Sequence, residues 1–155
     1  MSRLTLIIAG SIVGFSLLGA CSNMPDAKAN SAAIPTHIKP CADSPPRCVS
    51  TESQTPDRHM APLQFRDSRK VAQERLREIV KRIPRATITQ DVPGYLAVEV
   101  KSELMGFTDD VEFLFDAKEN IVRFRSSSRV GYYDFGVNRK RMEAITSEFQ
   151  VVSAK

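Results

Sequence analysis

The sequence predicts an α+β fold, in which an antiparallel sheet of about four strands carries two helices packed on one face. Apolar residues recur at helical spacing in two segments, residues 71–83 and 135–149, as on the buried side of an amphipathic helix. Between them, short stretches that alternate apolar and polar residues are separated by turn-forming residues, which is typical of antiparallel strands. Helices cover the apolar face of such a sheet, and two layers result.

The first predicted helix spans residues 71–83. Asp67 or Ser68 can cap its start, and Pro84 ends it, because proline cannot continue a helix. Its apolar side is formed by Val71, Ala72, Leu76, Ile79, Val80 and Ile83.

Four strands are predicted after this helix, each bounded by residues that favour turns. The predicted strands are residues 85–90, 95–102, 109–116 and 121–128. The predicted turns are residues 91–94, Met105-Gly106 and Lys118-Glu119.

Tight turns at Met105-Gly106 and Lys118-Glu119 would set the register of the last three strands. Val100 then opposes Val111, Val98 opposes Phe113, and Phe113 opposes Phe124. All of these apolar residues fall on one face, which supports the register.

The second helix is predicted from Phe135 to Phe149, with Val137, Met142 and Ile145 on its apolar side. Together with the strands, it completes a single α+β domain predicted over residues 40–152. The chain has 155 residues, which suits one domain. Its 22 basic and 18 acidic residues give a net charge of +4, too small for a dedicated nucleic-acid binder.

The first twenty residues resemble a secretory signal peptide. Arg3 is followed by an uncharged run from Leu4 to Ala20, and a basic start before such a run is typical of an export signal. Residues 18–21 read Leu-Gly-Ala-Cys and resemble a bacterial lipobox, in which the Cys21 thiol receives a diacylglyceryl group. The alternative is an uncleaved membrane anchor with an incidental cysteine.

Lipidation at Cys21 would attach the mature protein to a membrane, since several acyl chains make a stable anchor. The residue after the cysteine is Ser22 rather than aspartate, which in lipoproteins of enteric type resembles an outer-membrane address. We therefore expect a periplasm-facing, lipid-anchored protein of the cell envelope. Residues 21–39 are rich in Ala, Ser, Asn and Pro and predict a flexible tether.

Two further cysteines, Cys41 and Cys48, would enter an oxidising compartment on export. If Cys21 is lipidated, they form the one possible internal disulfide, which closes a loop at the start of the domain. A redox dithiol and half of a zinc site are the alternatives. The spacing is not Cys-x-x-Cys, and the chain has no second cysteine pair.

The polar side of the predicted sheet is the candidate functional site. The trial register places Glu99 beside Glu112, which in turn faces Arg125, and it places Lys101 beside Asp110. We expect Arg125 to neutralise the two opposed glutamates, because like charges in direct opposition repel.

Three interpretations of this face remain open. The first is a solvated surface of weak ion pairs. The second is a hard-cation site, although the nearby arginines oppose it; its ligands would be Glu99, Asp109, Asp110 and Glu112. The third is a site for an anion or phospholipid headgroup, since guanidinium groups suit phosphate and carboxylate. Its basic residues are Arg123, Arg125, Arg129, Arg139, Lys140 and Arg141.

Catalytic patterns are weak, and no cofactor or metal is predicted. His59 and Asp57 with a serine of residues 126–128 lack the nucleophile elbow of a hydrolase. Glu99 and Glu112 could act as an acid–base pair in glycan cleavage, but the chain has no tryptophan to stack a sugar.

Three segments resemble the family of domains of unknown function numbered 1499. They are residues 40–50 (PCADSPPRCVS), 106–113 (GFTDDVEF) and 125–141 (RSSSRVGYYDFGVNRKR). Arg47 makes the cysteine spacing one residue longer than the family pattern, a change confined to the loop. Bacterial members of that family are often lipoproteins or membrane-tethered, and the resemblance implies no activity.

The resemblance covers about residues 40–149 and directs attention to residues of the polar face. They are Asp109, Asp110, Glu112, Arg125, Ser126, Arg129, Asp134, Asn138 and Arg139. Structural roles stay open for three of them: Asp134 can cap the second helix, and Asn138 with Arg139 can brace the loop after Arg129.

Two hypotheses follow for function. The first is a non-enzymatic envelope module that binds an anionic envelope component or an envelope protein. The second is an enzyme that acts on an envelope polymer or lipid through Glu99, Asp110 and Glu112. A flat face of paired charges would favour the first, and a deep pocket with a buried carboxylate the second.

Overall fold

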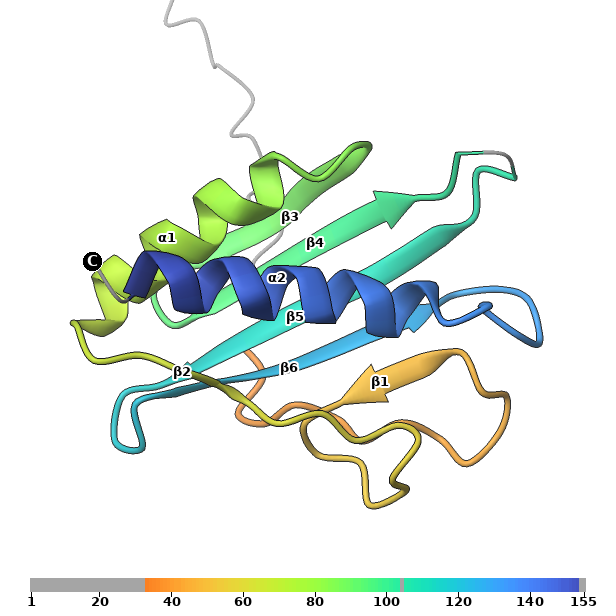
Figure 1. Ribbon diagram of the computed structural model, residues 1–155, viewed down its shortest axis with the longest axis horizontal. Helices are drawn as coiled ribbons and strands as arrows, with labels where there is room; N and C mark the ends of the chain where they lie inside the picture. Colours follow the sequence, from red (N-terminus) through yellow and green to blue (C-terminus); the bar gives the residue numbers. More distant parts are fainter. Residues whose placement is uncertain (1–32, 104, 154–155) are drawn as a thin grey trace, which may run out of the picture. The chain divides into compact units, whose positions relative to one another are not determined.

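A single antiparallel sheet carries both helices on one of its faces (Figure 1). The computed structural model describes residues 33–103 and 105–153. Its elements are β1 (Cys48–Ser50), β2 (Leu63–Gln64), α1 (Arg69–Lys81), β3 (Ala86–Val92), β4 (Tyr95–Lys101), β5 (Thr108–Asp116), β6 (Ile121–Ser128) and α2 (Val137–Ser153). The strand order is β1-β6-β5-β4-β3, and β2 also pairs with β6. The predicted α+β class is confirmed, and the described part of the chain forms six strands rather than about four.

Both helices begin at caps that the sequence supplies. Ser68 caps α1, since its Oγ accepts a hydrogen bond from the Val71 N–H at 3.3 Å. At the start of α2, the Asp134 carboxylate accepts from the Gly136 and Asn138 N–H groups at 3.0 and 3.3 Å. These contacts satisfy donors that a helix start leaves unpaired. They select Ser68 over Asp67 and confirm the role predicted for Asp134.

The hydrophobic core lies between the helices and the sheet. Phe113 and Phe124 are fully buried opposite one another on β5 and β6, and Phe149 of α2 is also fully buried. Burying one such side chain stabilises a fold by roughly 1.5–3 kcal/mol. Because side chains alternate along a strand, the neighbouring Glu112 and Arg125 fall on the opposite face. The predicted β5–β6 register is confirmed.

The predicted register between β4 and β5 is wrong by two residues. Val98, not Val100, opposes Val111, and Leu96 opposes Phe113. The connection spans residues 102–107, and the Ser102 N–H donates to the Phe107 carbonyl at 2.8 Å. Its centre therefore lies one residue before the expected turn. A shift of two preserves the face of every side chain, so alternation alone could not reveal the error.

The corrected register changes the charged neighbours on the polar side. Glu99 pairs with Asp110 rather than with Glu112, and Lys101 pairs with Thr108 rather than with Asp110. Glu112 instead lies opposite Ala97.

Cys41 and Cys48 form a disulfide with an S–S distance of 2.02 Å, so the predicted disulfide is confirmed over the zinc and dithiol alternatives. The bridge fixes the loop before β1, whose Cys48 and Ser50 pair with Ser127 and Arg125 of β6. The sequence analysis missed both β1 and β2.

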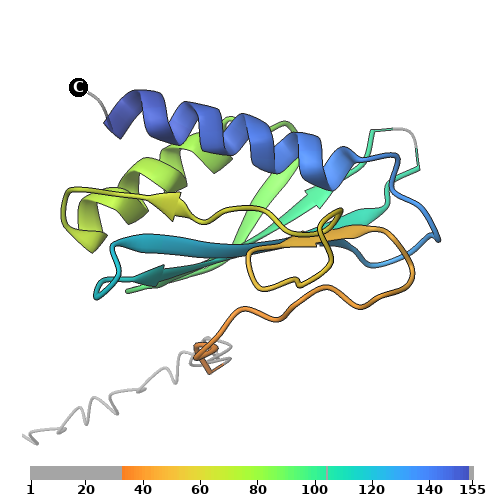
Figure 2. The ribbon, with the colours of Figure 1, turned by 60° about the horizontal axis from the view of Figure 1, so that its bottom comes forward.

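The chain before the disulfide lies on the side of the sheet away from the helices (Figure 2). Ile38 is only 2% exposed, and the Ser50 Oγ donates to the Lys39 carbonyl at 2.9 Å. The segment packed on the domain therefore reaches back at least to Ile38, within the predicted tether. Cys21 and the predicted signal peptide lie outside the described residues. Across residues 33–103 and 105–153, no helix is long and apolar enough to cross a membrane.

Candidate functional site

The sheet face opposite the helices, here called the open face, collects six of the nine candidate ligand residues. Their side chains come from β4, β5, β6 and the residue after β6, at positions that alternate with the core. The six are Glu99, Asp110, Glu112, Arg123, Arg125 and Arg129. The other three, Asp109, Asn138 and Arg139, lie elsewhere.

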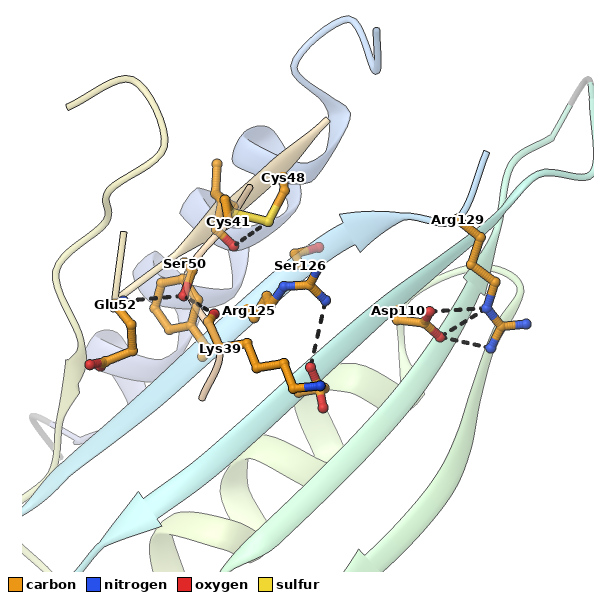
Figure 3. Close-up of polar contacts among 12 residues, drawn as sticks. Lys39, Cys41, Cys48, Ser50, Glu52, Asp110, Arg125, Ser126 and Arg129 are labelled. Atoms are coloured by element: carbon orange, nitrogen blue, oxygen red, sulfur yellow. Dashed lines mark hydrogen bonds and ion pairs between the residues drawn. A yellow bond between two sulfur atoms is a disulfide. The ribbon is translucent and has the colours of Figure 1, made fainter. Parts of the chain in front are cut away.

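Arg129 joins two opposed carboxylates. Its Nε and Nη2 donate to Asp110 at 3.0 and 2.7 Å (Figure 3). Its Nη2 also donates to Glu99. Hydrogen bonds from the guanidinium to Asp110 and Glu99 raise the pKa of Arg129. Arg129, rather than the expected Arg125, therefore neutralises the like-charged pair of β4 and β5.

Arg123 is held by three carboxylates at the other end of β6. Its guanidinium lies 2.6 Å from Glu119, 3.2 Å from Glu52 and 3.8 Å from Asp116. A guanidinium group with this set of partners offers little to an added anion.

Arg125, between these two arginines, is paired more loosely. Its Nη1 lies 3.7 Å from a Glu112 carboxylate oxygen, and its buried Nε has no hydrogen-bond partner among the described residues. The other Glu112 oxygen accepts from the Tyr95 hydroxyl at 2.9 Å. Burial and this acidic neighbour raise the pKa of Tyr95. Among the described residues of the open face, Arg125 is thus the arginine with a buried donor that has no acceptor.

A hollow of about 370 Å³ lies beside Arg125. Its lining comes from four strands, β3 to β6, and the N-terminal segment: Lys39, Thr89, Tyr95, Ala97, Val98, Asp110, Val111, Glu112 and Arg125. Figure 3 shows the Lys39 side chain extending toward the same space as the end of Arg125. Two cationic groups therefore border the hollow together with the carboxylates of Asp110, which Arg129 neutralises, and Glu112. The space is large enough for a small polar group.

Asp109 lies on the helix side of the sheet, which corrects its expected place on the polar face. It alternates with Asp110 along β5, and its carboxylate accepts from Arg141 Nη2 at 2.6 Å. The side chains of Asp109 and Arg141 are only 7% and 13% exposed. A carboxylate buried in this way needs its cationic partner to remain charged.

Asn138 belongs to the same buried network beneath α2. Its amide nitrogen donates to the Ser128 hydroxyl at 3.0 Å and to Asp134 at 2.9 Å. Its amide oxygen accepts from Arg141 at 2.8 Å and from the Ser126 hydroxyl at 2.6 Å. The network ties β6 to the first turn of α2. Arg141 was predicted only as a member of the basic cluster, and its role in this network was not predicted.

Arg139 braces a loop instead of facing the hollow, since it donates to the Asp57 and His59 carbonyls at 2.9 and 3.1 Å.

The residues of the conceivable catalytic triad have other partners. The His59 ring nitrogen lies 3.1 Å from the Ser53 carbonyl, and the Ser126 hydroxyl donates a hydrogen bond to Asn138. The structure therefore directs His59 and Ser126 to different partners, which does not support a triad. Within residues 33–103 and 105–153, no group of three or more His, Cys, Asp or Glu side chains could hold a metal ion.

Comparison with known protein families identifies a family whose model covers most of the described domain. The family model described as "Protein of unknown function (DUF1499)" matches residues 37–149, which covers the N-terminal segment at Ile38, the disulfide loop, the open face and most of α2. No curated protein and no solved structure matches this chain.

Proposed function

Because this chain belongs to the DUF1499 family of proteins of unknown function, we propose its role from its own residues: it is a lipid-anchored protein of the cell envelope whose domain is a non-catalytic binding module. The ligand is an anionic group of an envelope component, a phosphate or a carboxylate. It binds in the hollow of the open face, between Arg125 and Lys39.

The anchor is supported by the N-terminal sequence. A basic start, an uncharged run and a lipobox-like Leu-Gly-Ala-Cys ending at Cys21 are the features of an exported lipoprotein. The Cys41–Cys48 disulfide agrees with an oxidising compartment.

Metabolic labelling with a fatty-acid analogue tests the anchor. The wild-type chain should incorporate the label and fractionate with membranes, and Cys21→Ala should lose both properties. Cys21→Ala that keeps the label would contradict lipidation at this residue.

Binding is favoured over catalysis by the way the charges of the open face are paired. Glu99 and Asp110 share the Arg129 guanidinium, and Glu112 accepts from Tyr95. Each carboxylate is therefore engaged by a hydrogen-bond donor, whereas a general base needs an oxygen directed at its substrate. The hollow is also open rather than a deep pocket around a buried carboxylate.

The observation that carries the anion site is the unpartnered Nε of Arg125. A buried donor without an acceptor destabilises a fold by about 1–3 kcal/mol. A phosphate or carboxylate oxygen in the hollow would give the loosely paired Arg125 guanidinium a closer acceptor than Glu112 at 3.7 Å, and Lys39 would add a second positive charge. Guanidinium and ammonium groups both bind such oxygens through charge-assisted hydrogen bonds.

Calorimetric titration with pyrophosphate tests this site. Wild-type protein should bind saturably, and Arg125→Ala should weaken binding about tenfold or more, the loss expected for one charge-assisted hydrogen bond. Arg123→Ala is the matched control, because it removes the same charge from the same strand at a guanidinium that is already paired. Equal weakening by both variants, or no saturable binding to the wild type, would overturn the proposal.

A further inference from the structure

Two loops at one end of the sheet expose a group of apolar side chains, here called the tip. The β4–β5 loop and the β6–α2 loop leave neighbouring strands, since the Arg129 N–H donates to the Thr108 carbonyl at 3.0 Å. Figures 1 and 2 both show the two loops at the same end. The tip consists of Met105, Phe107, Val130, Tyr132, Tyr133 and Phe135, all of them exposed.

The fold holds these aromatic side chains outward. Phe135 is 79% exposed and Tyr132 is 72% exposed, and Phe135 has a φ of 55°, a left-handed conformation that bulky residues rarely adopt. The carboxylate of the preceding Asp134 accepts hydrogen bonds from the N–H groups of Gly136 and Asn138, which follow Phe135. Grouped exposed apolar residues of this kind mark interaction surfaces.

The charged groups without an ion-pair partner around the tip are basic, since Glu103 of the β4–β5 loop is paired with Arg85 at 3.5 Å. Within residues 33–103 and 105–153, no ion pair is described for Arg47, Lys101, Arg139 or Lys140. Arg47 donates to the Gly131 carbonyl at the base of the β6–α2 loop, and Lys140 is exposed on the first turns of α2. Asp134, the acid of that loop, is turned back to cap α2. The tip therefore combines exposed aromatic rings with a basic border.

We propose that the tip docks on an anionic lipid surface, with Tyr132, Tyr133 and Phe135 in the headgroup layer. Aromatic rings favour this layer, and nearby Lys and Arg side chains are attracted to anionic headgroups. A lipid surface accepts side chains that project from loops, whereas a protein partner would need matching pockets. The tip is a second binding surface, beyond the anion site of the proposed function.

The chain outside the described domain is long enough to permit this contact. Ile38 lies 17 positions after Cys21 in the sequence, and an extended chain of that length spans about 60 Å. A domain held by a lipid at Cys21 could therefore turn its tip toward the same membrane. Docking of the tip on a membrane does not itself require the lipid anchor at Cys21.

Tryptophan fluorescence of the full chain tests the proposal, because the natural sequence contains no tryptophan. The probe variant is Phe135→Trp. The control is Val151→Trp, which changes an exposed apolar residue near the other end of α2. Both proteins carry the same N-terminus and are added to vesicles of phosphatidylethanolamine and phosphatidylglycerol with brominated acyl chains.

The bromine should quench Phe135→Trp at least about threefold more than Val151→Trp, because interfacial side chains lie within reach of the acyl region. Adding Tyr132→Ser to the probe variant should reduce the quenching. Neutral phosphatidylcholine vesicles with brominated acyl chains should also quench the probe variant less. Equal quenching of the probe and the control would overturn the proposal. Blue-shifted probe emission that requires an envelope protein fraction, in the absence of lipid, would also overturn it in favour of a protein partner.

Discussion

Asp91 shows how one carboxylate joins α1 to the β3–β4 hairpin. It accepts from Gln73 Nε2 at 2.8 Å and from Arg77 Nη2 at 3.2 Å. The hydrogen bond from Arg77, with a smaller contribution from Gln73, lowers the pKa of Asp91 from its ordinary value of 3.8. The charged form of Asp91 is therefore favoured in the folded state.

We expect Asp91→Asn to lower the free energy of unfolding at pH 7 by about 0.5–1 kcal/mol, a value that allows for solvent screening of a partly exposed pair. A carboxyl group whose pKa is lower in the folded state than in the unfolded state stabilises the fold at pH values above its unfolded-state pKa. This contribution is lost as the pH falls through the folded-state pKa. Urea unfolding at pH 7 and pH 2 measures the effect. A difference between variant and wild type that is as large at pH 2 as at pH 7 would contradict the assignment.

Asp109 marks the limit of residue-level prediction from this sequence. Because it is an acidic residue, Asp109 was predicted on the polar face. Strand alternation, however, places its side chain on the other face of the sheet from the side chain of Asp110. The deciding partner, Arg141, is 32 residues away in sequence, and no local pattern connects the two. Arg125 was predicted as a site residue, whereas its unpaired Nε depends on side-chain packing that a sequence does not reveal.

At the scale of elements, the Asp109–Arg141 pair fastens α2 to β5. Removing one member leaves the other charge buried without its partner, which destabilises a protein by about 3–5 kcal/mol. We expect Asp109→Leu and Arg141→Met each to show a loss of this size in urea unfolding. The double variant should lose much less than the sum of the two, because no unpaired charge remains. Additive losses would show that the two side chains do not act as a pair.

The disulfide constrains the loop that leads into β1. It joins residues seven apart, and closing so short a loop stabilises a fold by about 2–3 kcal/mol in the chain-entropy model. The combined Cys41→Ser and Cys48→Ser variant should lose this amount in urea unfolding. Reduced wild-type protein serves as the control and should lose the same amount. An unchanged free energy of unfolding in both would contradict the stabilising role.

The helices and the four long strands could be predicted because each repeats its apolar residues over many positions. β1 and β2 could not, since they contain three and two residues and show no alternation. The β4–β5 register failed for a different reason. A six-residue connection replaced the assumed tight turn, and a shift of two residues leaves the apolar pattern intact.

In the described domain as a whole, the two faces of the sheet have different roles. The helix side holds the hydrophobic core and the buried Asp109–Arg141 network, and the open face holds paired charges and the Arg125 hollow. The sequence predicted one apolar and one polar face of the sheet, but it placed Asp109 and Arg141 with the polar residues. It did not predict that the N-terminal segment folds onto the open face, where Ile38 is buried and Lys39 borders the hollow. Its composition resembles a tether, and its contacts depend on the finished sheet.

Photo-crosslinking in intact cells from Ala97, which lines the hollow, tests the binding site most directly. Glu74, exposed on α1, is the control position for the same crosslinking residue. We predict a phosphate- or carboxylate-bearing envelope component captured from position 97, absent from position 74 and lost in Arg125→Ala. The same adducts from both positions, or capture at position 97 that persists in Arg125→Ala, would contradict the account.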